Sequence, residues 1–416
     1  MKYEVFWKNS GYSPRKELKG DINCDYLIVG GGIMGVSLAY FLNKLGAKNI
    51  VLIEKNEIGT GATGKSAGFL ALKGELDLVQ IMNKYGKKRG LLFWKGNREG
   101  LNLIRNIVKK EKINCDFEQE NTIYGTIVKG RIDKGEETNV LEEYIVEKDI
   151  EKDTELIVGK QLRKELNSPL FSYAIKSYDH GASVDPLKFV QSLSKKLDKK
   201  VKIYENTKLL KTKKNTAITP KGRIKFKKLI LAIDTRIKDR RIKALRSTIT
   251  ISQKLTKSQL KELNLLKHKM IWDSEDIYHY LKITPDNRIL IGYGDKKIHK
   301  KNPHPEPHIP HVKRIESFYK KIFPGKRFKI EYAWSGNFGI TNDRIPIIEQ
   351  KGNIVKFGGS ASQVVCVISA KHLAHQLLGR KHYLDEFFKH LKRADPGISL
   401  FSPELGLSYF TKSKKK

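Results

Sequence analysis

Cysteine is scarce in this chain of 416 residues, and nothing at its start has the pattern of a signal peptide. The three cysteines, Cys24, Cys115 and Cys366, lie far apart and form no CxxC pair, which excludes a disulfide framework. The first twenty residues are polar and lack the apolar stretch of a secretory leader. These absences fit a reducing compartment, and the sequence predicts a cytoplasmic protein.

Long hydrophobic runs are also lacking. The longest, YLIVGGGIMGVSLAYFL at 26–42, has a length near the lower limit for a membrane span. Three consecutive glycines in its middle indicate a strand, a tight turn and a buried helix instead.

Acidic residues are in short supply, because 45 Asp and Glu stand against 81 Lys and Arg, a formal net charge of +36. Such a field favours anionic partners such as nucleic acid, an anionic membrane surface or acidic small molecules. The cations are scattered singly and in pairs, with no basic–aromatic stripe. A lysine-rich solvated surface is therefore the favoured interpretation, with nucleic acid and peripheral membrane contact as alternatives.

What the sequence does contain is an alternation of strand and helix patterns. The first half predicts a strand at 25–30, a helix ending at Gly46, a strand at 49–54, a helical stretch at 84–112 and short strands, TIYGTIV and EYIVE, within 121–160. The second half predicts a helix begun by a DP pair within 181–197, strands between 201 and 233 (KVKIYE, KLLKTK, ITPKGRIKF and KLILAI), antiparallel strands at 270–294, and helices from about 312 and over 364–379. This order predicts a nucleotide-binding α/β domain of separated segments, with a mainly antiparallel domain inserted between them.

The first glycine-rich loop follows the strand at 25–30 directly. Gly30, Gly32 and Gly35 form a G-x-G-x-x-G pattern that opens a helix, and Glu54 ends the next strand, 19 positions past Gly35. In this context the glycines permit a tight turn and a close approach to a pyrophosphate, and the carboxylate accepts hydrogen bonds from a ribose. The sequence therefore predicts a dinucleotide site.

A second loop, GTGATGKSAG at 59–68, matches a P-loop by pattern, and LILAID at 229–234 imitates its magnesium-binding strand. A P-loop leaves its strand at the first glycine, whereas EKNEI intervenes here and places two carboxylates beside any triphosphate. We therefore expect the second loop to wrap the rest of a dinucleotide, and we assign no chemistry to Asp234.

The strand with GGGIMG, followed by LIEKNEIGTGATGKSAG, resembles the start of the FAD-dependent D-amino-acid oxidase-like superfamily, which includes glycine oxidase and sarcosine oxidase. The segments HGASVDPLKFVQSL, KKLILAID, YHYLKITPDNRILIGYGD, YAWSGNFGITNDRIPII and FGGSASQVV resemble later motifs of that family in the same order. The resemblance covers about residues 5–395. The aromatic N-terminal arm is most similar to the gamma-glutamylputrescine oxidoreductase branch.

The resemblance implies an α/β (α+β) fold: a Rossmann-like FAD-binding domain built from discontinuous segments, with an inserted, mainly antiparallel substrate domain. The predicted divisions are an arm at 1–20, an FAD-binding domain at 21–80, 178–245 and 330–400, a substrate domain at 81–177 and 246–329, and a basic tail at 401–416.

The activity that the resemblance implies is oxidation of a C–N bond in a small amine or amino acid. A hydride passes to the flavin N5, and the resulting imine hydrolyses. Oxygen, a quinone or another carrier would then take the electrons. Two alternatives stay open: an FAD-dependent tRNA-modifying oxidoreductase, which the net charge favours, and a non-catalytic FAD-binding subunit.

The resemblance also implies the FAD contacts. Those to the ADP half would come from Gly30, Gly32, Gly35 and Glu54, with Leu209 at the adenine. Those to the ribityl and ring portions would come from Thr63, Gly64, Lys65, Ser66, Ala67, Gly68, Gly358, Gly359 and Ser360. Further predicted FAD contacts are Ile33, Met34, Lys55 and Ala232. The helix at 364–379 would aim its N-terminus at the N1–C2=O edge of the flavin.

Three departures from the family pattern carry expectations. Gln363 stands about where His is common in relatives. Leu290 stands where oxidase relatives place an oxygen-activating Lys, which favours electron delivery to a quinone or carrier. Gly336 stands about where relatives with covalent flavin carry Cys, which predicts non-covalent FAD.

The predicted catalytic residues are Lys65, Tyr278, Tyr280 and Lys282. Lys65 would place a positive charge near the flavin ring, or else be a surface lysine. Lys282 would hold a substrate carboxylate as a point charge, or else point into solvent. Four histidines, His299, His304, His308 and His311, lie among prolines, and an exposed loop is favoured there over a metal site, so no metal is predicted.

Overall fold

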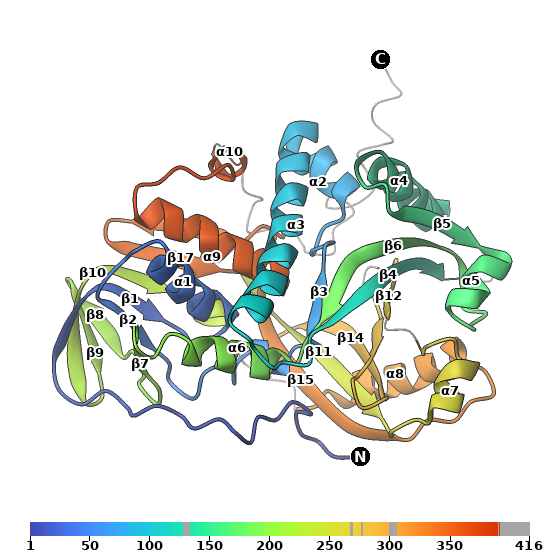
Figure 1. Ribbon diagram of the computed structural model, residues 1–416, viewed down its shortest axis with the longest axis horizontal. Coiled ribbons are helices and arrows are strands. Elements are labelled where there is room, and N and C mark those ends of the chain that lie inside the picture. The colour runs from blue at the N-terminus through green and yellow to red at the C-terminus, as the bar shows by residue number, and fades with distance from the viewer. Residues whose placement is uncertain (128–133, 267–268, 276–277, 299–305, 390, 392–416) are drawn as a thin grey trace.

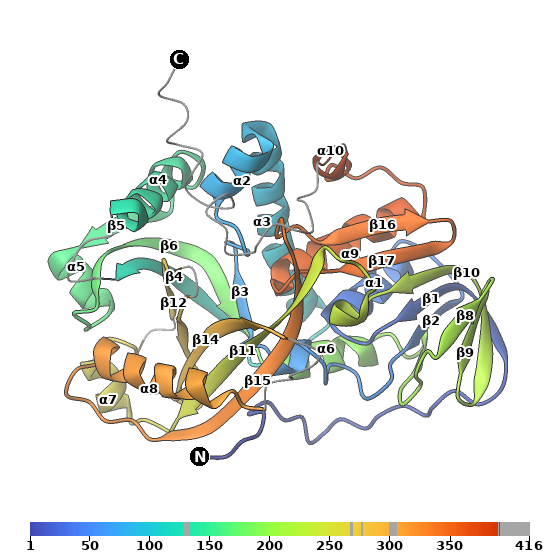
Figure 2. The same ribbon diagram turned by 180° about the vertical axis from the view of Figure 1, so that it is seen from behind.

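The computed structural model of the chain describes residues 1–127, 134–266, 269–275, 278–298, 306–389 and 391. Two sheets lie beside each other, and helices cover the outer faces (Figures 1 and 2). The predicted basic tail at 401–416 lies outside the described residues.

The first sheet joins strands that are far apart in the chain. Its order is β16(Ile347–Lys351), β17(Ile354–Gly358), β10(Gly222–Leu231), β1(Ile22–Val29), β2(Ile50–Ile53) and β7(Lys202–Tyr204), with β9(Thr216–Thr219) on β10 and β8(Lys211–Lys213) on β9. The five strands from β17 to β7 are parallel, and β16 runs antiparallel at the edge. This confirms the predicted Rossmann-like domain of discontinuous segments.

Helices cover one face of the first sheet. They are α1(Ile33–Lys44), α3(Lys87–Lys110), α6(Pro186–Lys195) and α9(Gln363–Leu377). Ile28 of β1 belongs to the core under these helices, whereas Leu27 and Val29 belong to a second core on the opposite face. Burial of both faces explains why the central strands are apolar without alternation.

The second sheet is mainly antiparallel, as the sequence predicts. Its order is β15(Ile330–Thr341), β11(Ile242–Ser252), β14(Ile289–Lys297), β13(Tyr280–Ile283), β12(Lys269–Asp273), β4(Glu118–Ile127), β6(Phe171–Ser183) and β3(Phe69–Ala71), with β5(Thr154–Val158) on β6. The pairing of β12 with β4 is parallel. The remaining elements are η1(Thr63–Lys65), α2(Leu78–Tyr85), α4(Lys134–Ile150), α5(Gly159–Glu165), η2(Asp234–Arg236), α7(Lys257–Glu262), α8(Ile309–Ile322) and α10(Asp385–Phe388).

Several element predictions need correction. The helical stretch at 84–112 is two helices, because Gly86 has a positive φ of 86° and separates α2 from α3. The piece EYIVE, predicted as a strand, lies within α4. In this helix Glu143 and Glu147 are fully buried, and both pair with Lys73. The buried positions at helical spacing are therefore glutamates, which a search for periodic hydrophobic residues does not detect. ITPKGRIKF and KLILAI are not separate strands, since β10 runs through both.

The predicted domain boundaries stay a prediction. Two observations differ from the predicted assignment. The strands β3 and β15 lie in the second sheet, although their residues were assigned to the FAD-binding domain. The helix α3 packs against α9, although its residues were assigned to the substrate domain. Within the described residues, no helix combines the length and apolar character that crossing a membrane requires.

Candidate active site

The first glycine loop lies at the carboxyl end of β1. Gly30 has a φ of +115°, and a Cβ there would lie 2.2 Å from the backbone oxygen of Ala232 at the end of β10. A Cβ on Gly35 would lie 1.9 Å from the backbone oxygen of Gly30. These contacts allow α1 to begin directly behind the turn, so that the backbone of the loop forms a wall without side chains.

Glu54 ends β2 beside this loop. Its Oε2 accepts the backbone N–H of Gly31 at 2.8 Å, and its Oε1 accepts that of Asn56 at 3.0 Å. The carboxylate is therefore fixed next to the glycines, where a nucleotide ribose would meet it.

The second loop contacts the first. Thr63 begins the short helix η1, and its Oγ1 accepts the backbone N–H of Ile33, the first residue of α1, at 3.0 Å. The Nε1 of Trp334 donates to the backbone oxygen of Lys65 at 2.9 Å, and the Nε2 of Gln363 donates to the Oγ of Ser66 at 3.1 Å. GTGATGKSAG therefore lies between both sheets and beside the first glycine loop, as expected for the continuation of one dinucleotide site.

Both loops open into one cavity of about 1230 Å³. At one end its wall comes from the glycine loops, Glu54 and the segment 207–209, with the cations Lys55, Lys208 and Arg236. The N-terminus of α1 and these three cations line the same cavity, and both kinds of group suit the two phosphates of a dinucleotide. The volume exceeds the roughly 300–1,000 Å³ of a pocket for one drug-sized ligand, so a dinucleotide and a further small molecule fit together.

At its other end the cavity is bounded by the second sheet. Tyr280 on β13 packs edge-on against Phe69, with ring centroids 5.4 Å apart, and its hydroxyl lies 3.3 Å from the Oγ of Ser247. Trp272 on β12 stacks on Tyr124 at 6.0 Å, and Tyr278 also lines this end. Aromatic rings thus form much of the wall that faces the glycine loops.

Carboxylates line the same end. Asp273 is 2% exposed and accepts Nδ1–H of His279 at 2.8 Å, while burial raises the pKa of its carboxyl. Burial, together with the nearby Glu143, raises the pKa of Asp77, which also caps the N-terminus of α2. Lys73 also lines the cavity, and its pairing with Glu143 and Glu147 raises the pKa of its ammonium despite burial.

Comparison with known proteins identifies the family. A family model described as FAD dependent oxidoreductase matches residues 25–376. This chain belongs to the FAD dependent oxidoreductase family. Gamma-glutamylputrescine oxidoreductase of Escherichia coli (strain K12) is 27% identical over 379 residues, covering 88% of this chain and 86% of that protein.

Solved structures show the same fold. Glycine oxidase from Geobacillus kaustophilus superposes with a TM-score of 0.73 at 14% identity, covering 90% of this chain and all of that one (100%). L-proline dehydrogenase from P. horikoshii superposes with a TM-score of 0.70 at 18% identity, covering 88% and 95%. The cofactor of this family of flavoproteins is FAD.

The residues present fit FAD. Gln363 is 5% exposed and lines the cavity, and its Oε1 has no hydrogen-bond partner among the described residues. A buried amide oxygen in this state indicates a ligand that donates to it. The side-chain-free wall at Gly30 and the carboxylate of Glu54 supply the other expected features of an FAD site.

Most residues predicted to contact FAD line the cavity. These are Gly30, Gly32, Ile33, Met34, Glu54, Lys55, Thr63, Lys65, Ser66, Ala67, Leu209, Ala232 and Ser360. The other five predicted contacts, Gly35, Gly64, Gly68, Gly358 and Gly359, lie behind this surface. A Cβ on Gly68 would lie 2.1 Å from the backbone oxygen of Val184, so this glycine allows two segments to approach closely rather than presenting a contact. The assignment of individual residues to parts of FAD stays a prediction.

The four predicted catalytic residues divide into two groups. Tyr278, Tyr280 and Lys65 line the cavity, and the Nζ of Lys65 pairs with Glu306 at 3.2 Å. Lys282 is 1% exposed, so the alternative that it points into solvent is wrong. Its Nζ donates to the backbone oxygen of Gly68 at 3.3 Å, behind the cavity wall, which disfavours a role in holding a substrate carboxylate.

Sequence reasoning missed the carboxylates of this end. Glu75 lies on the N-terminus of α9, where its Oε1 accepts from the Oγ of Ser360 at 2.9 Å and the backbone N–H of Ser362 at 2.7 Å. No motif marks Glu75, Asp77 or Asp273, because they come from loops and strand ends that only the fold brings together.

Two smaller expectations concern single residues. Asp234, to which no chemistry was assigned, accepts the backbone N–H of Gly339 at 3.0 Å and so joins the end of β10 to β15. The exposed loop expected around the histidines is wrong for His308 and His311: His308 is 6% exposed, His311 lies within α8, and their ring centroids are 4.2 Å apart. His299 and His304 lie outside the described residues.

Proposed function

We propose that this protein oxidises the C–N bond of a small amine or amino acid, giving an imine that water hydrolyses to a carbonyl compound and a released amine or ammonia. FAD, when bound, supplies the two-electron acceptor. The observation that carries the proposal is the single cavity that connects the glycine loops with the aromatic wall of the second sheet.

The walls of the cavity suit a protonated amine. The end of the cavity that is bounded by the second sheet is called the hairpin end. Its carboxyl groups are those of Glu75, Asp77, Asp273, Glu275 and Glu306, and its cationic groups are those of Lys65, Lys73 and Arg344. In a chain with a net charge of +36 this local surplus of acids is notable, because it attracts a cation that the rest of the surface repels.

The chain's own groups would orient the substrate and accept its proton. An amine must lose its ammonium proton before a hydride can leave the neighbouring carbon, and a carboxyl whose pKa lies near the working pH accepts that proton most efficiently. Asp77 and Asp273 both line the cavity and would be the candidates to accept this proton, and burial raises the pKa of each carboxyl above its ordinary value. Tyr278 and Tyr280 would hold the carbon skeleton against the flavin-facing side.

The names of the relatives support this substrate class. Gamma-glutamylputrescine oxidoreductase, glycine oxidase and L-proline dehydrogenase are each named for an amine or an amino acid.

The electron acceptor is proposed to be a quinone or another carrier rather than oxygen. Leu290, fully buried on β14, pairs across the sheet with Lys282, and it leaves an apolar side chain at the position where oxidase relatives are expected to have Lys. The absence of Cys at Gly336 supports FAD held without a covalent bond.

The test is an anaerobic screen of the purified flavoprotein against amines and amino acids, followed by admission of air. Loss of flavin absorbance with a subset of these compounds, and slow recovery in air, are expected. Rapid recovery in air would contradict the proposed acceptor. A flavin that no amine bleaches would contradict the proposed reaction and favour a non-catalytic FAD-binding subunit.

The net charge favours one second candidate, a tRNA-modifying oxidoreductase. RNA binding that weakens steeply with salt, with a slope set by the number of phosphates contacted, would support it. Turnover of a small amine that is insensitive to salt would exclude it as the main activity.

A further inference from the structure

Residues 1–18 of the N-terminal arm run along the outside of both sheets before the chain enters β1 (Figures 1 and 2). At its start Lys2 bridges to β15: its N–H donates to the oxygen of Glu331 at 2.6 Å and its oxygen accepts from Ala333 at 3.0 Å. At its end Leu18 is 2% exposed, and its N–H donates to the Oγ1 of Thr207 at 3.0 Å. The arm therefore connects the second sheet with the first.

Midway, the arm contacts the second FAD loop. Trp7 is 6% exposed, and its Nε1 donates to the backbone oxygen of Ser66 at 2.7 Å. Its ring lies edge-on to Trp334, with centroids 6.4 Å apart, and Trp334 holds the adjacent oxygen of Lys65. Two indoles from distant parts of the chain thus fix consecutive carbonyl groups of one loop.

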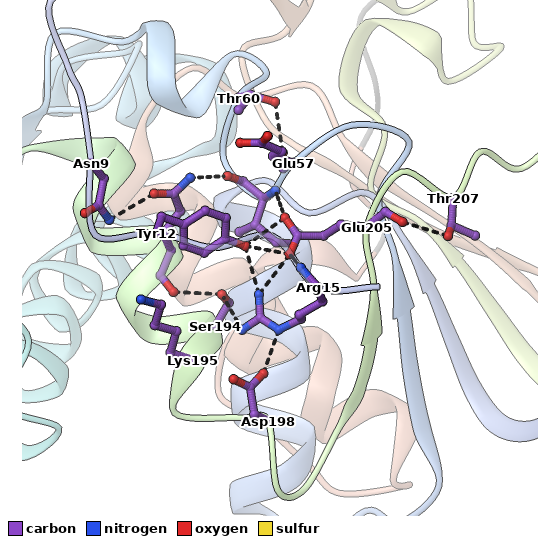
Figure 3. Close-up of polar contacts among 12 residues, drawn as sticks. Asn9, Tyr12, Arg15, Glu57, Thr60, Ser194, Lys195, Asp198, Glu205 and Thr207 are labelled. Atoms are coloured by element: carbon purple, nitrogen blue, oxygen red, sulfur yellow. Dashed lines mark hydrogen bonds and ion pairs between the residues drawn. The ribbon is translucent and has the colours of Figure 1, made fainter. Parts of the chain in front are cut away.

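A buried carboxylate joins the arm to the start of the same loop (Figure 3). Glu205, at the end of β7, is fully buried. Its carboxylate accepts from the hydroxyl of Tyr12, the backbone N–H of Arg15 and the backbone N–H of Ile58, each at 2.7 Å. The guanidinium of Arg15 lies 3.2 Å from the same group and compensates its charge.

A series of hydrogen bonds through side chains makes a second connection between the arm and Ile58. Asn9 donates to the Oε1 of Gln191 at 3.0 Å, and the Nε2 of Gln191 donates to the backbone oxygen of Ile58 at 3.0 Å. Both the N–H and the C=O of Ile58 are therefore tied to groups that the arm also contacts.

The arm acts from behind the site. None of residues 1–18, all of which the structure describes, lines the cavity, whereas residues 59–63 and 65–67 of the loop do. The loop contains four glycines in ten residues, so its own backbone is weakly restricted.

We propose that the arm is a clamp that holds the loop 58–68 in its FAD-binding geometry, with Trp7, Tyr12 and Arg15 as positioning residues. A loop that reaches its binding geometry only part of the time weakens the apparent affinity for its ligand by that fraction. The inference needs only FAD binding and is independent of the proposed reaction.

The test compares two matched substitutions in the full chain. Trp7→Phe removes the N–H to Ser66 and retains a ring. Trp94→Phe is the control, since Trp94 is 2% exposed and its Nε1 also makes a 2.7 Å hydrogen bond, to Glu151, while neither residue lines the cavity or contacts the loop. The measurements are the FAD Kd of the apoprotein and the amide hydrogen exchange of residues 58–68.

Trp7→Phe should raise the FAD Kd about fivefold, the equivalent of one hydrogen bond. It should also speed exchange in the loop of the apoprotein, and saturating FAD should restore the wild-type rate. Trp94→Phe should change neither. A Kd and loop exchange equal to wild type in Trp7→Phe, or an equal rise in Trp94→Phe, would show that the arm only stabilises the fold.

A second pair guards against misfolding of the first variant. Tyr12→Phe removes the hydroxyl that donates to Glu205, and Tyr40→Phe removes a comparable 2.9 Å bond from α1 to Glu111 at the end of α3. We expect a rise in Kd of about twofold for Tyr12→Phe, because Arg15 and Ile58 still contact Glu205, and no change for Tyr40→Phe. Equal Kd values in the two variants would overturn the proposal.

Discussion

The two ends of the cavity are built by different means. At the glycine-loop end the shape comes from backbone, since Gly30 and Gly35 make room for carbonyl oxygens at about 2 Å from where a Cβ would lie. At the hairpin end it comes from side chains such as Lys73, Asp77 and Asp273, which separate elements bring together. At the cofactor end the shape of the cavity is thus fixed by backbone atoms that leave no room for side chains. At the substrate end its shape depends on the charge and packing of side chains.

The largest expected effect tests the backbone end. Gly30→Ala places a methyl group against the oxygen of Ala232 in a left-handed conformation, so FAD bound per purified chain should fall from near one to near zero. Gly46→Ala is the control, because Gly46 also has a positive φ, of 93°, but a Cβ there meets no atom within 4 Å and the residue does not line the cavity. Normal FAD content in Gly30→Ala, measured from the absorbance of the purified protein, would show that the wall tolerates a side chain.

The next prediction tests the side-chain end. Lys73→Met leaves the fully buried Glu143 and Glu147 without their cation, and the free energy of unfolding should fall by about 3–5 kcal/mol. Lys88→Met, at an exposed pair with Glu386, should cost less than about 1 kcal/mol. Chemical denaturation measures both, and similar losses in the two variants would mean that the buried cluster is not specially stabilising.

A third prediction concerns the seam between the sheets. Burial raises the pKa of Asp234 from its ordinary value of 3.8 to about 6. The folded state therefore holds this proton more tightly than the unfolded state, and its stabilising contribution is lost as the pH rises from 3.8 through 6. Asp234→Asn should be more stable than wild type above pH 6, by about 3 kcal/mol, and equal to it well below pH 3.8.

The control for this variant has the opposite sign. The hydrogen bonds from Arg241 lower the pKa of Asp239, so its contribution is present above the ordinary value and is lost in acid. Asp239→Asn should therefore be less stable than wild type at neutral pH, by an amount that stays constant down to about pH 4 and begins to shrink only below the ordinary value of 3.8. Unfolding curves for both variants across pH 3–8 that run parallel would refute the assignment.

The smallest expected effect sharpens the boundary between the two ends. The carboxylate of Glu75 lies on the N-terminus of α9, where the fold aims positive potential into the cavity. Glu75→Gln removes that charge and should raise the reduction potential of bound FAD by about 20 mV, equivalent to about 1 kcal/mol for two electrons. Glu57→Gln, on the exposed side of the loop, should leave the potential unchanged.

The same contrast explains how much the sequence could predict. The glycine pattern at the first loop depends on local backbone geometry, and the structure confirms the strand, turn and helix predicted from Gly30, Gly32, Gly35 and Glu54. The antiparallel hairpin of Tyr280 was likewise readable from its alternation. The burial of Lys282 could not be predicted, because it depends on Trp7 and Phe69, whose rings lie 5.5 and 5.7 Å from its Nζ and come from remote segments.

The secondary structure of α4 could not be predicted for the same reason, because it depends on a residue that is remote in the sequence. Its buried positions 143 and 147 are glutamates, and only the pairing with Lys73 makes their burial favourable. No local pattern reveals a cation that lies about seventy residues earlier in the chain, so the strand-like run EYIVE was the signal that remained.

The most direct test of the central claim is a single-turnover experiment on the purified flavoprotein without oxygen. An amine that bleaches the flavin is mixed with the enzyme, and the carbonyl product and reduced flavin are both counted. One carbonyl product is expected for each flavin reduced, since hydride loss and imine hydrolysis follow from one oxidation. Bleaching without carbonyl product, or a flavin that every amine and amino acid leaves oxidised, would contradict the claim.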